Sequence, residues 1–200
     1  MALCFAHTAA GYLAYEVGRP PGAHRPRLLA AAVLLANAPD LDFVPGLVVG
    51  APGAYHRGVT HTLAAVVVVG VAVALTGWLA RRPYRLWTRA AVWASATYAS
   101  HLLLDYFTTD AAPPYGGRFL WPLSNAFYLA PVTPLGEIII DPSSRAGFLR
   151  SLVGPHTFRI WGADLAVLAF AVGAVQVLRV VGRAAATVPA AEKSSEGLVP

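Results

Sequence analysis

The sequence predicts an all-α fold, a polytopic bundle of membrane helices, and three observations favour it. Of the 200 residues 56% are hydrophobic, and the mean hydropathy is +0.56. Only 15 Lys+Arg and 10 Asp+Glu carry a formal charge, about half the usual share of a soluble domain. Ala, Leu and Val dominate the apolar runs, and no run alternates as a half-buried strand would. This composition excludes a disordered chain, a nucleic-acid-binding arm and, with Cys4 as the single cysteine, a disulfide-stapled module.

Two apolar runs approach the length of about 20 residues that a bilayer crossing requires. Residues 62–80 form a run of 19 without a charge, and residues 163–181 carry only Asp164 and Arg179 near their ends. A third run, 86–107, is apolar but contains ionisable side chains. Residues 8–17 and 28–38 are each about half a membrane thickness long as helices. We expect these two to form a helical hairpin or tilted helices.

The remaining segments are predicted to be less regular. Residues 108–155 are rich in Pro, Gly and aromatic residues, which favours loops and short helices at the membrane interface. Residues 183–200 are rich in Ala, Ser and Glu and are expected to form a flexible tail. The chain is therefore predicted to contain one helical membrane domain, residues 1–182, followed by this tail.

The basic residues predict an orientation. Along an alternating helix path, ten of them fall on one face: Arg19, Arg25, Arg27, Arg81, Arg82, Arg85, Arg89, Arg179, Arg183 and Lys193. The positive-inside rule makes that face cytoplasmic. The isoelectric point near 9.7 then reflects orientation in a plasma (inner) membrane, with the bilayer as partner and no nucleic acid. The oligomeric state stays open.

Seven ionisable residues lie at the opposite, non-cytoplasmic end of the predicted helices. Ionisable groups at membrane depth are costly and usually functional. The seven, called the His/Asp cluster below, are His7, Asp40, Asp42, His56, His61, His101 and Asp105. The two other histidines, His24 and His156, lie beside Arg or Pro in loops and are expected to be bystanders.

Three short motifs hold six of the seven residues. In HLLLD, His101 and Asp105 share one helix face at a spacing of four and could bind a cation, or could simply hydrogen-bond each other. PDLD places Asp40 and Asp42 just past a helix end, as ligands or as solvated turn formers. In HRGVTH, Gly58 would allow His56 and His61 to approach one site, unless both are unrelated interfacial histidines. We expect Thr60 to cap the following helix.

Four imidazoles and three carboxylates are a plausible ligand set for one or two divalent ions. Imidazole with carboxylate suits borderline metals, so Zn²⁺ is expected first and Mn²⁺ second. Two such ions could activate water for attack on an ester or phosphodiester. Asp42 or Asp40, whichever is not a ligand, could act as base, and Arg57 could hold a phosphate.

These motifs together, with an LWPLS segment at residues 120–124, resemble the YdjM-type family of membrane-bound proteins, described as metal-dependent hydrolases. The resemblance covers residues 1–125. It implies a core like that of zinc-dependent phospholipase C and the related single-strand nucleases. It also implies ligands at His7, Asp40 or Asp42, His56 or His61, His101 and Asp105. The chain lacks a second helical HxxxE pair after residue 125, so the resemblance implies one or two ions rather than three.

The favoured function is thus a membrane-embedded metal-dependent hydrolase acting on a phosphodiester or ester, with a lipid or lipid-linked substrate. The alternative is a non-enzymatic metal-binding or structural membrane protein. Transport would need a polar path across the bilayer, but residues 62–80 offer only two threonines. That scarcity favours a one-sided site over a conduit.

Overall fold

The computed structural model describes residues 4–19, 24–111, 113–141 and 143–187, with Cys4 and residues 183–187 described by their backbone alone. Over these residues it is all-helical, as predicted, and two isolated β-bridges are the only extended pairings. The helices are α1 (Cys4–Gly18), α2 (Pro26–Asn37), η1 (Ala38–Asp42), α3 (Phe43–Val49), η2 (Val59–His61), α4 (Leu63–Leu79), α5 (Tyr84–Tyr106), α6 (Arg145–Ser151) and α7 (Pro155–Thr187).

Close helix contacts depend on small residues. A side chain at Gly11 in α1 would come within 2.9 Å of the Ala32 carbonyl oxygen in α2, and Ala32 and Ala36 are fully buried. The Trp93 indole of α5 donates a 2.9 Å hydrogen bond to the Ala14 carbonyl of α1. Since apolar lipid provides little hydrophobic force between helices, such close backbone packing is what holds membrane helices together.

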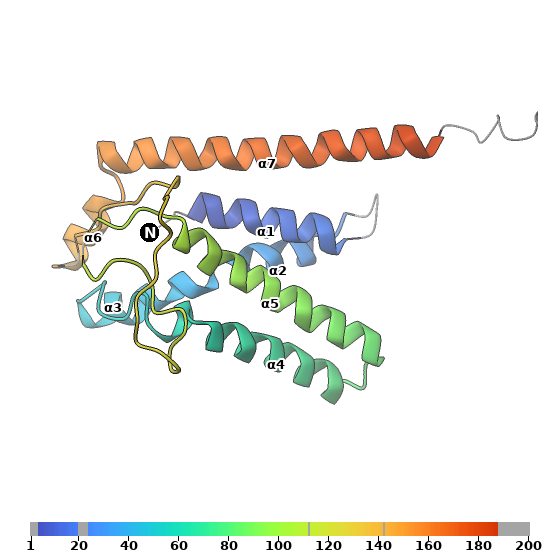
Figure 1. Cartoon of the computed structure of the whole chain (residues 1–200), viewed down its shortest axis with the longest axis horizontal. Helices are drawn as coiled ribbons and strands as arrows, with labels where there is room; N and C mark the ends of the chain where they lie inside the picture. The colour runs from blue at the N-terminus through green and yellow to red at the C-terminus, as the bar shows by residue number, and fades with distance from the viewer. Residues whose placement is uncertain (1–3, 20–23, 112, 142, 188–200) are drawn as a thin grey trace, which may run out of the picture.

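The helices run between two distinct ends of the molecule (Figure 1). α1 runs from the end marked N toward the opposite end, α2 returns, α4 leaves again and α5 returns. Charged residues follow this path, because Arg19, Arg25, Arg81, Arg82 and Arg85 lie at or beside the helix ends that are remote from His7. The alternating path deduced from the sequence thus has a structural counterpart in the described residues.

One of the two expected spans is long enough to be a candidate, and the other forms a shorter apolar helix. Residues 163–181 lie within Pro155–Gly182, which is long and apolar enough to cross a membrane. Residues 62–80 instead form a helix of 17 residues, about 26 Å long, short of a hydrocarbon core of about 30 Å. The run 28–38 continues through η1 into α3, so Pro26–Val49, with 24 residues, becomes the second candidate span.

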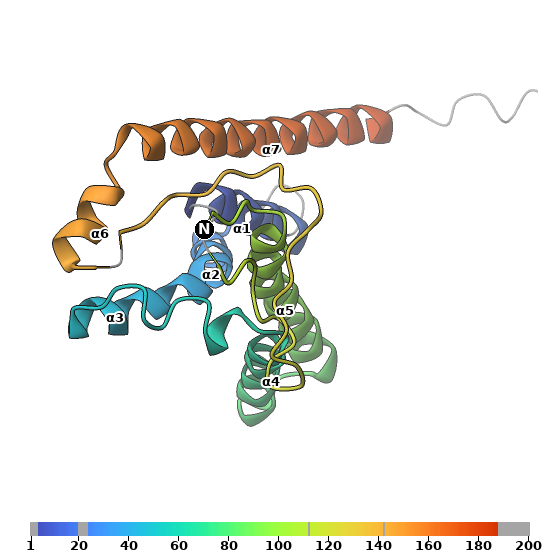
Figure 2. The same ribbon diagram turned by 60° about the vertical axis from the view of Figure 1, so that its left-hand side comes forward.

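Helix α7 lies alongside α1 and stands apart from α4 and α5 (Figures 1 and 2). Three contacts along its length join it to α1: Trp161 packs edge-on against Phe5, Gln176 donates to the Tyr12 hydroxyl, and Arg179 pairs with Glu16. The helix continues to Thr187, so the tail expected from residue 183 begins with helix. Residues 188–200 lie outside the described part of the chain.

Residues 107–111, 113–141 and 143–144 cross the end of the bundle at which α1 begins, as Figure 2 shows in yellow-green to orange. They contain little regular structure, as expected for the Pro- and Gly-rich segment. Backbone hydrogen bonds tie the segment down: Leu63 donates to Phe119 at 2.8 Å, and Ala130 donates to Tyr106 at 2.9 Å. This segment therefore forms a cover over one end of the bundle.

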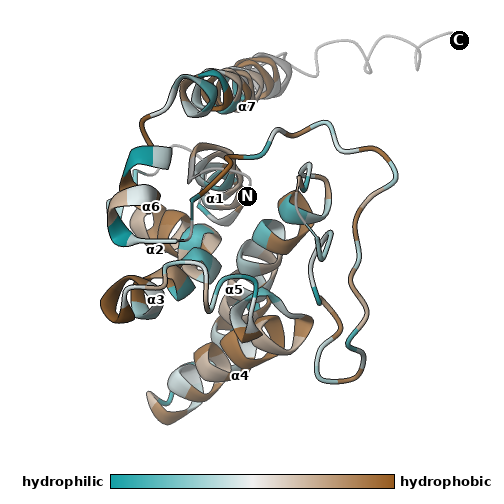
Figure 3. Cartoon of the chain, turned by 90° about the vertical axis from the view of Figure 1, so that its left-hand side faces the viewer, coloured by the Kyte–Doolittle hydropathy of each residue, from teal (hydrophilic) through white to brown (hydrophobic). Residues whose placement is uncertain are grey.

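The outer surface suits an apolar environment. In Figure 3, α3 and α4 are largely hydrophobic, while α6 carries hydrophilic turns. None of the residues in the most apolar stretch of Pro155–Gly182 is buried within the protein. Exposed apolar side chains on this scale mark a contact surface for lipid or another chain.

Candidate metal centre

The structure brings the seven residues of the His/Asp cluster together from five segments. His7 comes from α1, Asp40 and Asp42 from η1, His56 from the loop before η2, His61 from η2, and His101 and Asp105 from α5. His7 and His101 are completely buried, and His61 is 1% exposed. Residues up to 98 positions apart in sequence therefore meet in one enclosed volume.

Four ligand atoms form the centre of the cluster. The Nε2 atoms of His61 and His101 lie 3.2 Å apart. Asp40 Oδ1 lies 3.5 Å from each of them, and Asp105 Oδ2 lies 3.5 and 3.4 Å from them. The two carboxylate oxygens thus each lie within 3.5 Å of both nitrogens, so the imidazoles and carboxylates face a common position that a cation could occupy.

The Nε2 atoms of the two central imidazoles face each other. His101 Nδ1 lies 2.8 Å from the Ala36 carbonyl oxygen, which can only accept, so Nδ1 carries a proton. His61 Nδ1 lies 3.1 Å from Asp42 Oδ2, again an acceptor. With both Nδ1 atoms protonated, the facing Nε2 atoms, 3.2 Å apart, are the positions left for a shared proton or a metal ion.

Most of the buried polar side-chain atoms without a hydrogen-bond partner belong to this cluster. Within the described residues they number nine, and seven come from four cluster members: both nitrogens of His7, both oxygens of Asp40, both oxygens of Asp105, and Nε2 of His56. Burying such groups unpaired is costly. A cation ligated by them would remove that cost.

The ligand atoms also divide into two groups of three. His7, His101 and Asp105 form one, and Asp40, His56 and His61 form the other, each with its ligand atoms within 4.8 Å of one another. The two groups meet where His61 faces His101. Three protein ligands per ion leave a position open for water or substrate, as in catalytic zinc sites.

Asp42 lies outside the central four atoms. Its Oδ1 is 3.1 Å from His56 Nδ1, and its Oδ2 is 3.1 Å from His61 Nδ1. The Thr60 hydroxyl donates to the same carboxylate at 3.0 Å. Because η1 is a 3₁₀ helix rather than the expected extended or turn segment, Asp40 and Asp42 point in different directions. Asp42 is thus placed to orient two imidazoles.

Thr60 is a supporting residue that the sequence pattern assigned to another role. Thr62, not Thr60, caps α4, since its hydroxyl accepts from the Ala65 amide at 3.2 Å. Tyr98, three residues before His101, donates to the Thr60 carbonyl at 2.7 Å. Gly58 has negative φ, and its role is close approach: a side chain there would lie 2.8 Å from the Tyr55 carbonyl oxygen. The left-handed residue of the loop is Arg57.

Two histidines of the cluster, His56 and His61, lie in the segment between α3 and α4, and their pKa values are shifted. Burial lowers the pKa of His56, although its Asp42 partner opposes the shift. Burial alone would lower the pKa of His61, but hydrogen bonds to Asp40 and Asp42 outweigh it, and the pKa is raised. His56 is therefore neutral and able to ligate at pH 7, while His61 attracts a positive charge.

Comparison with known proteins assigns the chain to a family. The profile of the YdjM inner membrane protein family matches residues 1–185. The chain belongs to this family. It is also 35% identical over 111 residues to the inner membrane protein YbcI of Escherichia coli (strain K12). That alignment covers 53% of this chain and 60% of YbcI. No solved structure matches.

This assignment confirms the resemblance found in the sequence and identifies an inner membrane protein. The match extends past residue 125 and includes α7, the longest candidate span. The ligand roles of the seven residues stay a prediction, to which the structure adds the distances between their side chains.

Arg57 of this YdjM family member lies at the edge of the cluster. It lines a small cavity with His61, Asp105, Gly117 and Phe119, so its charge is available beside the predicted ligands. Its guanidinium pairs with Asp110 in the covering segment, which also accepts from the Gly116 amide at 2.7 Å. The sequence pattern missed Asp110 because its partner lies 53 residues away.

Proposed function

We propose that this YdjM family member is a membrane-embedded, metal-dependent hydrolase that cleaves a phosphodiester or ester in a lipid or lipid-linked substrate. One observation carries the proposal: seven buried polar atoms of the cluster lack hydrogen-bond partners, and they lie around two imidazoles whose Nε2 atoms face each other at 3.2 Å. A purely structural core would have no use for such an arrangement, since unpaired buried polar groups destabilise a fold.

The ligand chemistry supports one or two divalent ions, Zn²⁺ first and Mn²⁺ second. His7, His101 and Asp105 would hold one ion, and Asp40, His56 and His61 the other. When bound, such ions lower the pKa of water and polarise a phosphoryl or carbonyl oxygen.

The remaining residues of the site have distinct roles. Asp42 holds the Nδ1 atoms of His56 and His61, so Nε2 of both rings is left for the ions. The sequence predicts that Asp42 is a ligand or a base. These two contacts favour neither role and indicate instead that Asp42 orients the imidazoles of His56 and His61. Arg57 would bind an anionic oxygen of the substrate, and it must exchange Asp110 for that oxygen.

A lipid substrate is supported by an apolar cavity next to the cluster. The cavity of about 350 Å³ extends along α4 beside Val68 and Val69 to Thr60. Thr60 in turn contacts Asp42 and His61. An acyl chain in this cavity would bring its headgroup to the predicted ligands. We place the site on the non-cytoplasmic side of a multi-pass bundle with a phospholipase C-like core, consistent with the remote arginines.

Turnover by the purified protein tests the proposal. The protein should hydrolyse a phospholipid and a small synthetic phosphodiester when Zn²⁺ or Mn²⁺ is added, and a chelator should abolish this hydrolysis. His101→Ala and Asp105→Asn should each reduce turnover at least about 100-fold, as removal of metal ligands or their supports commonly does. His156→Ala is the matched control, because His156 contacts the Glu137 carbonyl rather than the cluster. Equal activity in His101→Ala and wild type would remove the site assignment.

A metal-binding protein without enzymatic activity is the second candidate. The approach of both carboxylates to the facing Nε2 atoms of His61 and His101 favours it, because four protein ligands around one ion would form a closed, structural site. Metal analysis separates the two functions. One ion per chain with no turnover indicates the structural site, whereas two ions with turnover indicate the hydrolase.

A further inference from the structure

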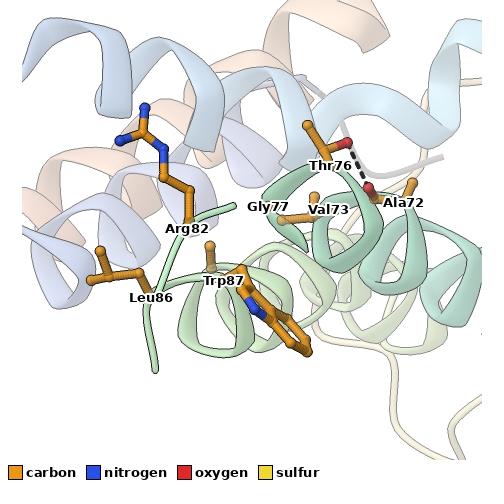
Figure 4. A pocket seen from close by; sticks show the side chains of 8 residues that line it. Ala72, Val73, Thr76, Gly77, Arg82, Leu86 and Trp87 are labelled. Atoms are coloured by element: carbon orange, nitrogen blue, oxygen red, sulfur yellow. Dashed lines mark hydrogen bonds between the residues drawn. The ribbon is translucent and has the colours of Figure 1, made fainter. Parts of the chain in front are cut away.

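The end of the molecule remote from the His/Asp cluster carries an apolar cavity. It has a volume of about 520 Å³ and lies between α4 and α5 next to their connecting turn (Figure 4). Its walls are mostly apolar and small, from Ala72, Val73 and Gly77 on α4 to Ala90 on α5, with Trp87 and Leu86 beside them. We call this the α4–α5 groove.

Four arginines without a carboxylate partner among the described residues lie in the lining of the groove or close to it in sequence. Arg82 lines it, and Arg81, Arg85 and Arg89 are exposed close by in sequence. No acidic residue occurs between Asp42 and Asp105 in the sequence. Glu16, an acidic side chain at this end, is paired with Arg19 and Arg179. The four arginines therefore lack an acidic partner among the described residues.

The groove offers its ligand few other polar groups. The Thr76 hydroxyl, the one side-chain hydroxyl in its lining, donates to the Ala72 carbonyl at 2.7 Å and so is satisfied within α4 (Figure 4). A ligand that fits must combine an apolar body with an anionic head. In a membrane protein, the molecule with that chemistry at the required depth is an anionic phospholipid.

We propose that the α4–α5 groove binds an anionic phospholipid, with one acyl chain between α4 and α5 and the headgroup phosphate on Arg82. Arg81, Arg85 and Arg89 add to the electrostatic attraction. This site is separate from the His/Asp cluster and does not depend on the proposed hydrolysis.

Native mass spectrometry of the full chain in a mild detergent tests the proposal. The probes are palmitoyl-oleoyl phosphatidylglycerol and the zwitterionic phosphatidylcholine with the same chains. We expect phosphatidylglycerol to bind at least about fivefold more tightly, since each arginine near the headgroup contributes about that factor. Arg82→Gln should weaken its binding about fivefold. Ala72→Phe, which fills the groove from an exposed position, should weaken binding by a similar factor or more.

Two matched controls complete the experiment. Arg27→Gln removes an exposed arginine at the same end but on α2, and Val71→Phe enlarges an exposed neighbour outside the groove. Both should bind phosphatidylglycerol as the wild type does. The proposal is overturned if the two lipids bind equally, or if Arg82→Gln and Arg27→Gln behave alike. It is also overturned if Ala72→Phe changes the oligomeric state of the protein but leaves lipid binding unchanged. Elution of each variant as a folded monodisperse species shows that the comparison is valid.

Discussion

The two central imidazoles show how single contacts decide the chemistry of this site. Their Nδ1 protons go to the Ala36 carbonyl and to Asp42, which fixes both tautomers. The Nε2 atoms are then held 3.2 Å apart, facing each other. Each ring alone is an ordinary buried histidine, but as a pair they frame a position for a shared proton or a metal ion. The site therefore depends on the groups behind the rings as much as on the rings.

Replacement of Asp42 by Asn tests that dependence. An amide is uncharged and accepts less strongly than a carboxylate, so both His56 and His61 should lose their fixed orientation. We expect Zn²⁺ affinity to fall about 10- to 100-fold while the number of bound ions stays the same. Competition with a chromophoric chelator measures the affinity.

Asp141→Asn is the control for Asp42→Asn, because Asp141 is an exposed carboxylate that accepts from the backbone of Ser143. Loss of a bound ion in Asp42→Asn would contradict the orienting role and return Asp42 to the ligands. Unchanged affinity would show that the Nδ1 contacts contribute nothing.

The sequence predicts the cluster members better than their roles. The spacing of His101 and Asp105 on one helix face is enough to foresee that pair, because helix geometry is regular. The contacts of Thr60, Ala36 and Asp110 were not foreseeable. They involve a backbone carbonyl or partners 18 to 65 residues away, and no local pattern encodes such distances.

At the level of elements, the packing of α1 on α2 controls where His7 lies. Gly11 is one turn along α1 from His7, and its Cα faces the backbone of Ala32 and Val33. The Asn37 amide donates to the Thr8 hydroxyl at 3.3 Å and fixes the same pair of helices near the cluster. A change in the separation of these helices would therefore move His7.

Gly11→Ala should push α1 away from α2. The added methyl group would lie 2.9 Å from the Ala32 carbonyl oxygen and 2.9 Å from the Val33 Cα atom. Both are backbone atoms that cannot move aside. We expect destabilisation of about 1–3 kcal/mol and weaker metal binding. The midpoint of thermal unfolding in detergent and a Zn²⁺ titration measure the two effects.

Gly173→Ala provides the comparison, because nothing lies within 4 Å of a side chain at that position of α7. It should leave stability unchanged or raise it, since Ala favours helix more than Gly does. A Gly11→Ala protein as stable as Gly173→Ala would show that α1 and α2 are not in close contact.

Helix existence follows from the apolar runs, but helix ends do not. The run at residues 62–80 loses its first residue to the cap at Thr62 and its last to the turn at Ala80, so its helix has 17 residues, at the short end of the range for a bilayer crossing. The run at 28–38 gains η1 and α3, because Pro39 is accommodated in the first turn of a 3₁₀ helix. Caps and short 3₁₀ segments are local events that hydropathy does not report.

At the scale of the whole molecule, charge and site chemistry are separated. The arginines of the α4–α5 turn and the start of α2 lie at one end, and the His/Asp cluster lies at the other. The sequence anticipates this separation because helices that alternate in direction bring every second turn to the same side. It does not anticipate that α7 contacts α1 rather than α4 or α5, since its apolar surface has no preferred side.

Cysteine labelling in intact cells tests the orientation. In a Cys4→Ser background, Tyr115→Cys should react with a membrane-impermeant maleimide, because residue 115 lies in the cover over the cluster. Pro83→Cys, in the α4–α5 turn, should react only after the cells are permeabilised. Both positions are exposed, so accessibility within the protein does not limit either reaction. Reaction of both from the same side would falsify the proposed topology.

The gathering of ligands from distant parts of the chain has a mechanical consequence. With one cysteine, the protein cannot form a disulfide within the chain. An ion held by His7, His101 and Asp105 would act as a reversible crosslink between α1 and α5. It would close a loop of roughly 95 residues, and long loops restrict the unfolded chain most. Loss of the ion would then loosen the packing of the helices that the ion joins.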